Sequence, residues 1–128
     1  MIKYYLTSTA LFIFSLTACA QVDNNKMISN DEFRNLIKSN PSSIILDVRT
    51  VEEVTGQLRK IENAIHIPVQ ELSRRINELE QYKDEEIIII CRTQNRSSAA
   101  VDILIRNGFK AKCVNGGMIE YSAKAKKE

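Results

Sequence analysis

Cys91 directly follows four consecutive isoleucines, residues 87–90, and two arginines come soon after it in the sequence. Arg92 and Arg96 both stand within the next five residues. The thiolate is the nucleophilic form of a cysteine, and neighbouring positive charge favours the thiolate over the thiol. The pattern therefore predicts a reactive thiol in a setting that also attracts an anionic substrate, in preference to an inert core cysteine.

The elements on either side of Cys91 strengthen this interpretation. Residues 87–90 are predicted to form a buried strand, and a helix is predicted over residues 97–107. The loop of residues 91–96 would then lie between a strand end and a helix start. The first N–H groups of a helix have no partner within the helix, and the helix dipole favours negative charge beside them. We therefore expect the main-chain amides of this loop to form a cradle for an anion.

The remaining pattern predicts an α/β domain with a parallel sheet. Four isoleucines without alternation are typical of a strand covered on both faces. Strands and helices alternate with short connections, and ligands of such sheets bind beyond the carboxyl ends of the strands, where Cys91 would lie. Further strands are predicted over residues 44–48, 64–67 and 110–114. Helices are predicted from a capping box at Ser29 and Glu32 up to Asn40, over residues 70–82 and over residues 118–126, with one helical turn at residues 52–54.

No metal site or cofactor is expected. The sequence has no CxxC motif, and its single histidine, His66, reads as a strand residue with no Cys or His near it in sequence. Cys113 stands in an alternating strand without a basic cluster and is predicted to be an inert core thiol, although a disulfide with Cys91 stays open. The net charge of +2 does not suggest a nucleic-acid partner.

Residues 1–18 are predicted to be a signal peptide that is removed. A positively charged N-terminal region is followed by an apolar stretch that is too short for a transmembrane helix, which needs roughly 20 apolar residues. The segment ends in small residues before Cys19, which resembles the lipobox of bacterial lipoproteins. That resemblance implies a lipidated Cys19, a tether over residues 19–26, a folded domain over residues 27–128, and an exported, membrane-anchored protein of a bacterial cell envelope. An ordinary cleaved signal with a chance cysteine is the alternative.

Four segments, in order, resemble the landmarks of the rhodanese-like single-domain sulfurtransferases. They are "ILDVRTVEEV" (45–54), "ENAIHIPVQEL" (62–72), "IIIICRTQNRSSAAVDIL" (87–104) and "GFKAKCVNGGMIEY" (108–121). The resemblance covers nearly the whole predicted domain. It implies a rhodanese-like α/β fold, in which a central parallel five-stranded sheet is flanked by helices on both faces.

The resemblance also implies a reaction. Cys91 would take a sulfane sulfur from thiosulfate or a similar small anionic donor and pass it from a persulfide to a thiol or to cyanide. Asp47 and Arg49 would brace the site, with Arg49 paired to Glu52 or Glu53, and a monomer would suffice. The expected sulfur-holding and donor-binding residues are Arg92, Thr93, Gln94, Asn95, Arg96 and Ser97.

Two alternatives stay open, and one departure from the family bears on them. Cell-cycle phosphatases and arsenate reductases of this general fold use a C-x5-R loop, whereas four residues separate Cys91 from Arg96 here. The shorter ring suits one sulfur better than a phosphate. A sulfur carrier without small-molecule turnover is the second alternative. Gln94 stands where the family usually has glycine, so a positive φ there would strain the loop by about 1 kcal/mol.

Overall fold

The computed structural model describes residues 24–127 of the 128-residue chain. The predicted signal peptide, Cys19 and most of the predicted tether therefore lie outside the described residues. No helix among residues 24–127 combines the length and the apolar composition that crossing a bilayer requires.

Five parallel strands form one sheet in the order β1-β5-β4-β2-β3. This confirms the predicted α/β class and the five-stranded sheet. Three of the strands lie within segments that the sequence pattern predicts, β4 begins one residue before its predicted segment, and β1 was implied only by the family resemblance. The strands are β1 (Met27–Ile28), β2 (Ile44–Asp47), β3 (Ile65–His66), β4 (Glu86–Ile90) and β5 (Lys110–Val114).

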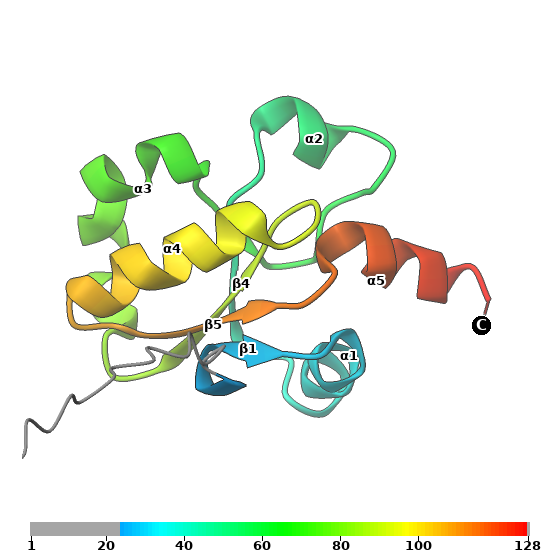
Figure 1. Ribbon diagram of the computed structural model, residues 1–128, viewed down its shortest axis with the longest axis horizontal. Helices are drawn as coiled ribbons and strands as arrows, with labels where there is room; N and C mark the ends of the chain where they lie inside the picture. Colours follow the sequence, from blue (N-terminus) through cyan, green and yellow to red (C-terminus); the bar gives the residue numbers. More distant parts are fainter. Residues whose placement is uncertain (1–23, 128) are drawn as a thin grey trace, which may run out of the picture.

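The isoleucine run of β4 is buried on both faces, as predicted. Ile87, Ile89 and Cys91 belong to one core cluster, to which α3, the 3-10 segment η2 and α4 contribute. Ile88 and Ile90 belong to a second cluster, with side chains of α1 and α5. Helices therefore cover both faces of the sheet, and Cys91 continues the face that α4 covers. In Figure 1, α3 and α4 lie on one side of the strands and α1 on the other.

The helices mostly follow the predicted segments. The predicted capping box is present, because Ser29 and Glu32 bond each other's backbone N–H groups at the start of α1. The helices are α1 (Asn30–Ser39), α2 (Val51–Thr55), α3 (Val69–Arg75), α4 (Asn95–Arg106) and α5 (Gly117–Ala125), with 3-10 segments η1 (Asn24–Lys26) and η2 (Ile76–Tyr82).

Two predicted boundaries are wrong in an informative way. The helix predicted over residues 70–82 changes at Ile76 from α3 into the 3-10 segment η2. Ile76 and Leu79 both contact the core and are three residues apart, a spacing that fits either winding, so apolar spacing alone could not separate them. Helix α4 begins at Asn95, two residues before the predicted Ser97, with Gln94 as its N-cap residue. The first turn of α4 therefore starts inside the predicted loop.

β2 and β4 are neighbours in the sheet, and the strands that follow them in sequence lie on opposite sides of this pair. From β2 the chain continues to β3 at one edge, and from β4 it continues to β5 on the other side. Asp47, the last residue of β2, is in register with Ile90, the residue before Cys91. Ligands of open parallel sheets bind at such a switch point, beyond the carboxyl ends of the strands.

Candidate active site: the cysteine loop

The thiol of Cys91 lies against the first turn of α4, as predicted. Its Sγ is 3.4 Å from the hydroxyl oxygen of Ser97, to which the S–H donates. The Ser97 hydroxyl in turn donates to the carbonyl of Gln94 at 2.9 Å. Cys91 is only 1% exposed, so the thiol sits at the bottom of the loop of residues 91–96, here called the cysteine loop.

The start of α5 holds two carbonyls of the cysteine loop. The N–H of Met118 donates to the Cys91 carbonyl at 2.9 Å, and the N–H of Ile119 donates to the Arg92 carbonyl at 3.1 Å. In a trans peptide the N–H points away from the carbonyl. The N–H groups of Arg92 and Thr93 therefore point to the side of the loop away from α5. In Figure 1 the start of α5 lies beside the connection from β4 to α4.

The cysteine loop keeps a series of main-chain donors uncommitted. Within residues 24–127, none of the N–H groups from Arg92 to Ser97 donates to another protein group, and the first bond of the turn runs from the Ser98 N–H to the Gln94 carbonyl. Those of Asn95, Arg96 and Ser97 are the unpaired donors of a helix start. Such donors favour an anion, and a negatively charged sulfur is one anion that this position could hold.

Gly117 makes the close approach between α5 and the cysteine loop possible. Its φ is +54°, and a Cβ built there would lie 2.2 Å from the carbonyl oxygen of Thr93 and 2.6 Å from that of Cys91. The buried side chain of Asn30 holds the same turn, because its Nδ2 donates to the carbonyls of Asn115 and Gly117 at 3.0 and 3.1 Å.

Asp47 and Arg49 form a buried ion pair beside the cysteine loop. The two side chains are 1% and 0% exposed, and Arg49 Nη2 lies 2.7 Å from Asp47 Oδ2. The predicted pairing of Arg49 with Glu52 or Glu53 is therefore wrong. Arg49 pairs instead with the Asp47 carboxylate, two residues before it at the end of β2. Its only hydrogen bond to Glu53 goes to the main-chain carbonyl, at 3.3 Å. Arg49 Nη2 also donates to the Arg59 carbonyl at 2.8 Å, which ties the strand end to the segment after α2.

Arg96 is held by Glu53, in a pairing that the sequence did not indicate. Its Nη1 and Nη2 donate to the two carboxylate oxygens of Glu53 at 2.6 and 2.7 Å. The hydrogen bonds from Arg96 lower the pKa of Glu53 to about 2, and the bond to Glu53 raises the pKa of Arg96. Arg96 was expected to contact an anionic donor, but both of its terminal nitrogens bind this carboxylate. Arg92 is exposed and has no ion-pair partner within residues 24–127.

Gln94 fits the loop without left-handed backbone. Its φ is −161°, which is an extended value that any residue adopts. The cost that a positive φ would have imposed on a glutamine does not arise, because the loop takes another path.

The sequence named Glu53 only as a possible partner of Arg49, and it gave Gly117 no part in the site. The one local signal at Glu53 was its place as the last residue of a second capping box, since Thr50 accepts from its N–H at 3.4 Å. Gly117 belongs to the double-glycine turn that the sequence did show. The residues of this turn alone do not indicate that it packs against the cysteine loop, which begins 26 residues earlier.

In the part of the chain that the structure describes, the other titratable residues do not assemble into a second centre. Cys91 and Cys113 are both free thiols, and Cys113 Sγ contacts the Ser98 hydroxyl at 3.6 Å. The ring Nε2 of His66 lies 2.8 Å from the Arg49 carbonyl, which can only accept, so Nε2 carries the proton. Among residues 24–127, no three His, Cys, Asp or Glu side chains are placed to hold a metal ion.

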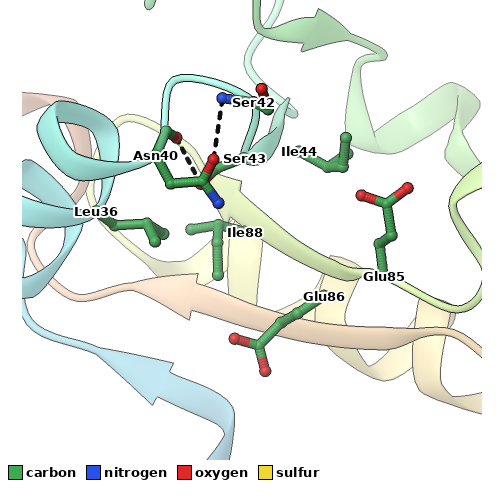
Figure 2. A pocket seen from close by; sticks show the side chains of 8 residues that line it. All are labelled: Leu36, Asn40, Ser42, Ser43, Ile44, Glu85, Glu86 and Ile88. Carbon is green, nitrogen blue, oxygen red and sulfur yellow. Dashed lines mark hydrogen bonds between the residues drawn. The ribbon is translucent and has the colours of Figure 1, made fainter.

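A pocket of about 280 Å³ lies at the opposite edge of the sheet, where β2 and β4 begin (Figure 2). Ile44 and Glu86, the first residues of these strands, line it together with Asn40 and the serines of the turn before β2. Its eight lining residues include no cysteine or histidine. It therefore offers no thiol or imidazole that could compete with Cys91.

Comparison with known proteins agrees with this geometry. The model of the rhodanese-like domain family matches residues 29–124. YrkF of Bacillus subtilis, named as a sulfur carrier protein, is 37% identical over 99 residues, which are 76% of this chain and 51% of YrkF. YtwF of the same organism, named as a sulfurtransferase, is 32% identical over 101 residues, 79% of this chain and 94% of YtwF.

A solved structure supports the same assignment. A rhodanese-like domain protein from Staphylococcus aureus is 34% identical, has a TM-score of 0.68, and is matched over 75% of this chain and 90% of its own. The chain spans about half of YrkF but nearly all of YtwF and of the staphylococcal protein. The family match, the two relatives and the fold agree, and the chain belongs to the rhodanese-like domain family.

Proposed function

We propose that this protein is a sulfurtransferase that carries a sulfane sulfur on Cys91. The observation that carries the proposal is the position of the Cys91 thiol, at the base of a loop whose main-chain N–H groups from Arg92 to Ser97 are uncommitted. An added sulfur would extend from Sγ into this ring of donors. The same donors would stabilise the negative charge of a persulfide.

The reaction proceeds in two covalent steps. The Cys91 thiolate attacks the outer sulfur of thiosulfate, the S–S bond of the donor breaks, and sulfite leaves with the bonding electron pair. A nucleophilic acceptor, cyanide or a thiolate, then attacks the outer sulfur of the persulfide and restores the Cys91 thiolate. Ping-pong kinetics are expected for such a scheme.

The charged residues take different parts in this proposal. Arg92, exposed and unpaired within the described residues, attracts the anionic donor. Arg96 positions the first turn of α4 through Glu53, and its positive charge stays close to the anion. Asp47 and Arg49 brace the strand end beside the cysteine loop.

Intact-mass measurement tests the proposal. The full chain is incubated with thiosulfate and weighed, cyanide is added, and thiocyanate is followed. One added sulfur is expected, which Cys91→Ser abolishes and Cys113→Ala retains. If Cys91→Ser still gains the sulfur, the assignment of Cys91 is wrong.

A sulfur carrier is the second candidate. YrkF is named as a carrier. In that case the sulfur loads onto Cys91 but cyanide does not remove it. Turnover of an aryl phosphate would instead support a phosphatase.

We also propose that the protein is exported and held at a membrane by lipid on Cys19. The lipobox-like segment before Cys19 supports this placement. The proposed activity does not depend on it.

A further inference from the structure

A groove with a basic rim adjoins the cysteine loop. It lies between α5 and the segment that follows α2, and its volume is about 370 Å³. Leu58, Met118 and Tyr121 form its buried and half-buried floor, and exposed side chains of Arg59, Lys60 and Lys126 stand at its rim. We call it the α5 groove.

The rim cations lack partners of opposite charge. No carboxylate lines the α5 groove, and none of the three rim cations forms an ion pair within residues 24–127. The nearby Lys124 shows the contrast, because it pairs with Asp31 at 2.7 Å and with Glu120 at 3.2 Å. The positive charge of α5 is therefore neutralised on the side that faces α1 and left open on the side of the groove.

The floor of the groove is held in place. The Tyr121 ring packs edge-on against Phe33, with ring centroids 5.7 Å apart, and the Arg34 guanidinium lies 4.5 Å from the Tyr121 centroid. The Ser122 hydroxyl donates to the Leu58 carbonyl at 3.5 Å and joins the two walls. A preformed surface of this kind binds a ligand at a low ordering cost.

One end of the groove lies beside the cysteine loop. Met118 lines the groove, and its N–H holds the Cys91 carbonyl. From Met118 to Lys126 the helix axis advances about 12 Å, which corresponds to about four residues of extended chain.

We infer that the α5 groove binds a short extended acidic segment of a protein acceptor whose thiol takes the sulfur from Cys91. The inference rests on the proposed function. A small anion such as thiosulfate would have no use for the apolar floor, and a wholly apolar segment would leave three cations unpaired. An anionic lipid would match both features, but it gains nothing from a groove that lies beside the cysteine loop.

The transfer step balances without another reactant. The acceptor thiol loses its proton to solvent, and its sulfur attacks the outer sulfur of the Cys91 persulfide. A new S–S bond forms on the acceptor, the old S–S bond breaks, and the electron pair returns to the Cys91 sulfur. No net oxidation or reduction takes place.

Two model acceptors test this inference with the full chain. One is a fluorescein-labelled hexapeptide that alternates glutamate and leucine and ends in an added cysteine, and the other has glutamine for glutamate. Cys91 is loaded with thiosulfate, and single-turnover transfer to each peptide is followed by intact mass. The acidic peptide should reach half-saturation at a concentration at least tenfold lower than the glutamine peptide.

A charge-reversal pair supplies the variant and its control. Lys60→Glu with Lys126→Glu should remove the tenfold preference for the acidic peptide. Lys38→Glu with Arg74→Glu makes the same change in net charge at exposed positions outside the groove and should keep the preference. Loss of the preference in both double variants, or no preference in the unmodified chain, overturns the inference.

Two further measurements keep the outcomes apart. Fluorescence anisotropy of the labelled peptides, measured with the unloaded chain, reports binding to the groove even if thiosulfate fails to load Cys91. Failure to load would refute the proposed function alone.

Vesicles of phosphatidylglycerol and phosphatidylcholine test whether the groove binds an anionic lipid. Vesicle binding that depends on Lys60 and Lys126, without peptide binding, overturns the acceptor segment.

Discussion

Gly117 is the residue on which the cysteine loop rests most directly. It combines a positive φ with close contact to three loop carbonyls, so a side chain there meets backbone atoms that cannot move aside independently. Gly108 also has a positive φ, +84°, but a Cβ there would only touch the end of the Lys83 side chain at 3.4 Å. Substituting each glycine in turn therefore distinguishes the free-energy cost of a left-handed backbone from the cost of displacing the cysteine loop.

Gly117→Ala is expected to lower the free energy of unfolding by roughly 3 kcal/mol, against about 1 to 2 kcal/mol for Gly108→Ala, which bears the backbone penalty alone. Urea denaturation checks both values. Gly117→Ala should also slow the loading of sulfur on Cys91 at least tenfold, while Gly108→Ala should load at the parent rate. Equal effects of the two substitutions on loading would show that the loop does not depend on its contact with Gly117.

At the scale of elements, the Glu53–Arg96 pair joins α2 to the first turn of α4. The two side chains are 20% and 29% exposed, and the contact has two short hydrogen bonds. Glu53 also closes the start of α2, because its carboxylate accepts from the Thr50 N–H at 3.0 Å. One carboxylate thus fixes two helix starts, and one of them carries the loop donors.

The stability that this pair contributes should depend on pH. Hydrogen bonds from Arg96 lower the pKa of Glu53 from 4.5 to about 2, so the contribution is complete above the unfolded value and disappears as the pH falls through about 2. Glu53→Gln should therefore reduce the free energy of unfolding by about 1 to 2 kcal/mol at pH 7, after allowance for partial exposure. The difference from the parent should shrink from about pH 5 towards pH 2.

Glu78→Gln is the control for this measurement. Glu78 also pairs with an arginine, Arg75, at 2.8 Å, but it is 52% exposed on the surface. Exposed ion pairs contribute little to stability, so Glu78→Gln should reduce the free energy of unfolding less than Glu53→Gln does at pH 7. A Glu53→Gln deficit that stays constant between pH 7 and pH 2 would contradict the ion-pair account.

The elements differ in how far the sequence could predict them. The isoleucine run of β4 and the capping box of α1 are local patterns, and both are confirmed. The two-residue strand β1 is too short to show any periodicity. The Glu53–Arg96 pair joins residues 43 positions apart, and the partner of Arg49 was decided by burial beside Asp47, so neither could be read from local spacing.

At the scale of the whole molecule, the parallel sheet places the start of the described chain and the cysteine loop at opposite edges. All five strands run in the same direction, so the chain enters β1 at the amino edge while Cys91 follows β4 at the carboxyl edge. The segment that would carry the proposed lipid joins the described chain at Asn24, just before β1. An anchor at Cys19 would therefore hold the amino edge towards the membrane and leave the cysteine loop facing away from it.

With the proposed anchor at Cys19, we expect the sulfur chemistry to be independent of anchoring. In a bacterial host, Cys19→Ala should move the protein from the membrane fraction to the soluble fraction and remove the mass of the lipid, because no acyl chain then remains to bury. The anchored and released forms should load sulfur on Cys91 at rates within about twofold of each other, since the loop faces away from the bilayer in the anchored form. A parent protein whose intact mass shows no lipid on Cys19 would contradict the lipid anchor. Loading at least tenfold slower in the anchored form would mean that the cysteine loop faces the lipid.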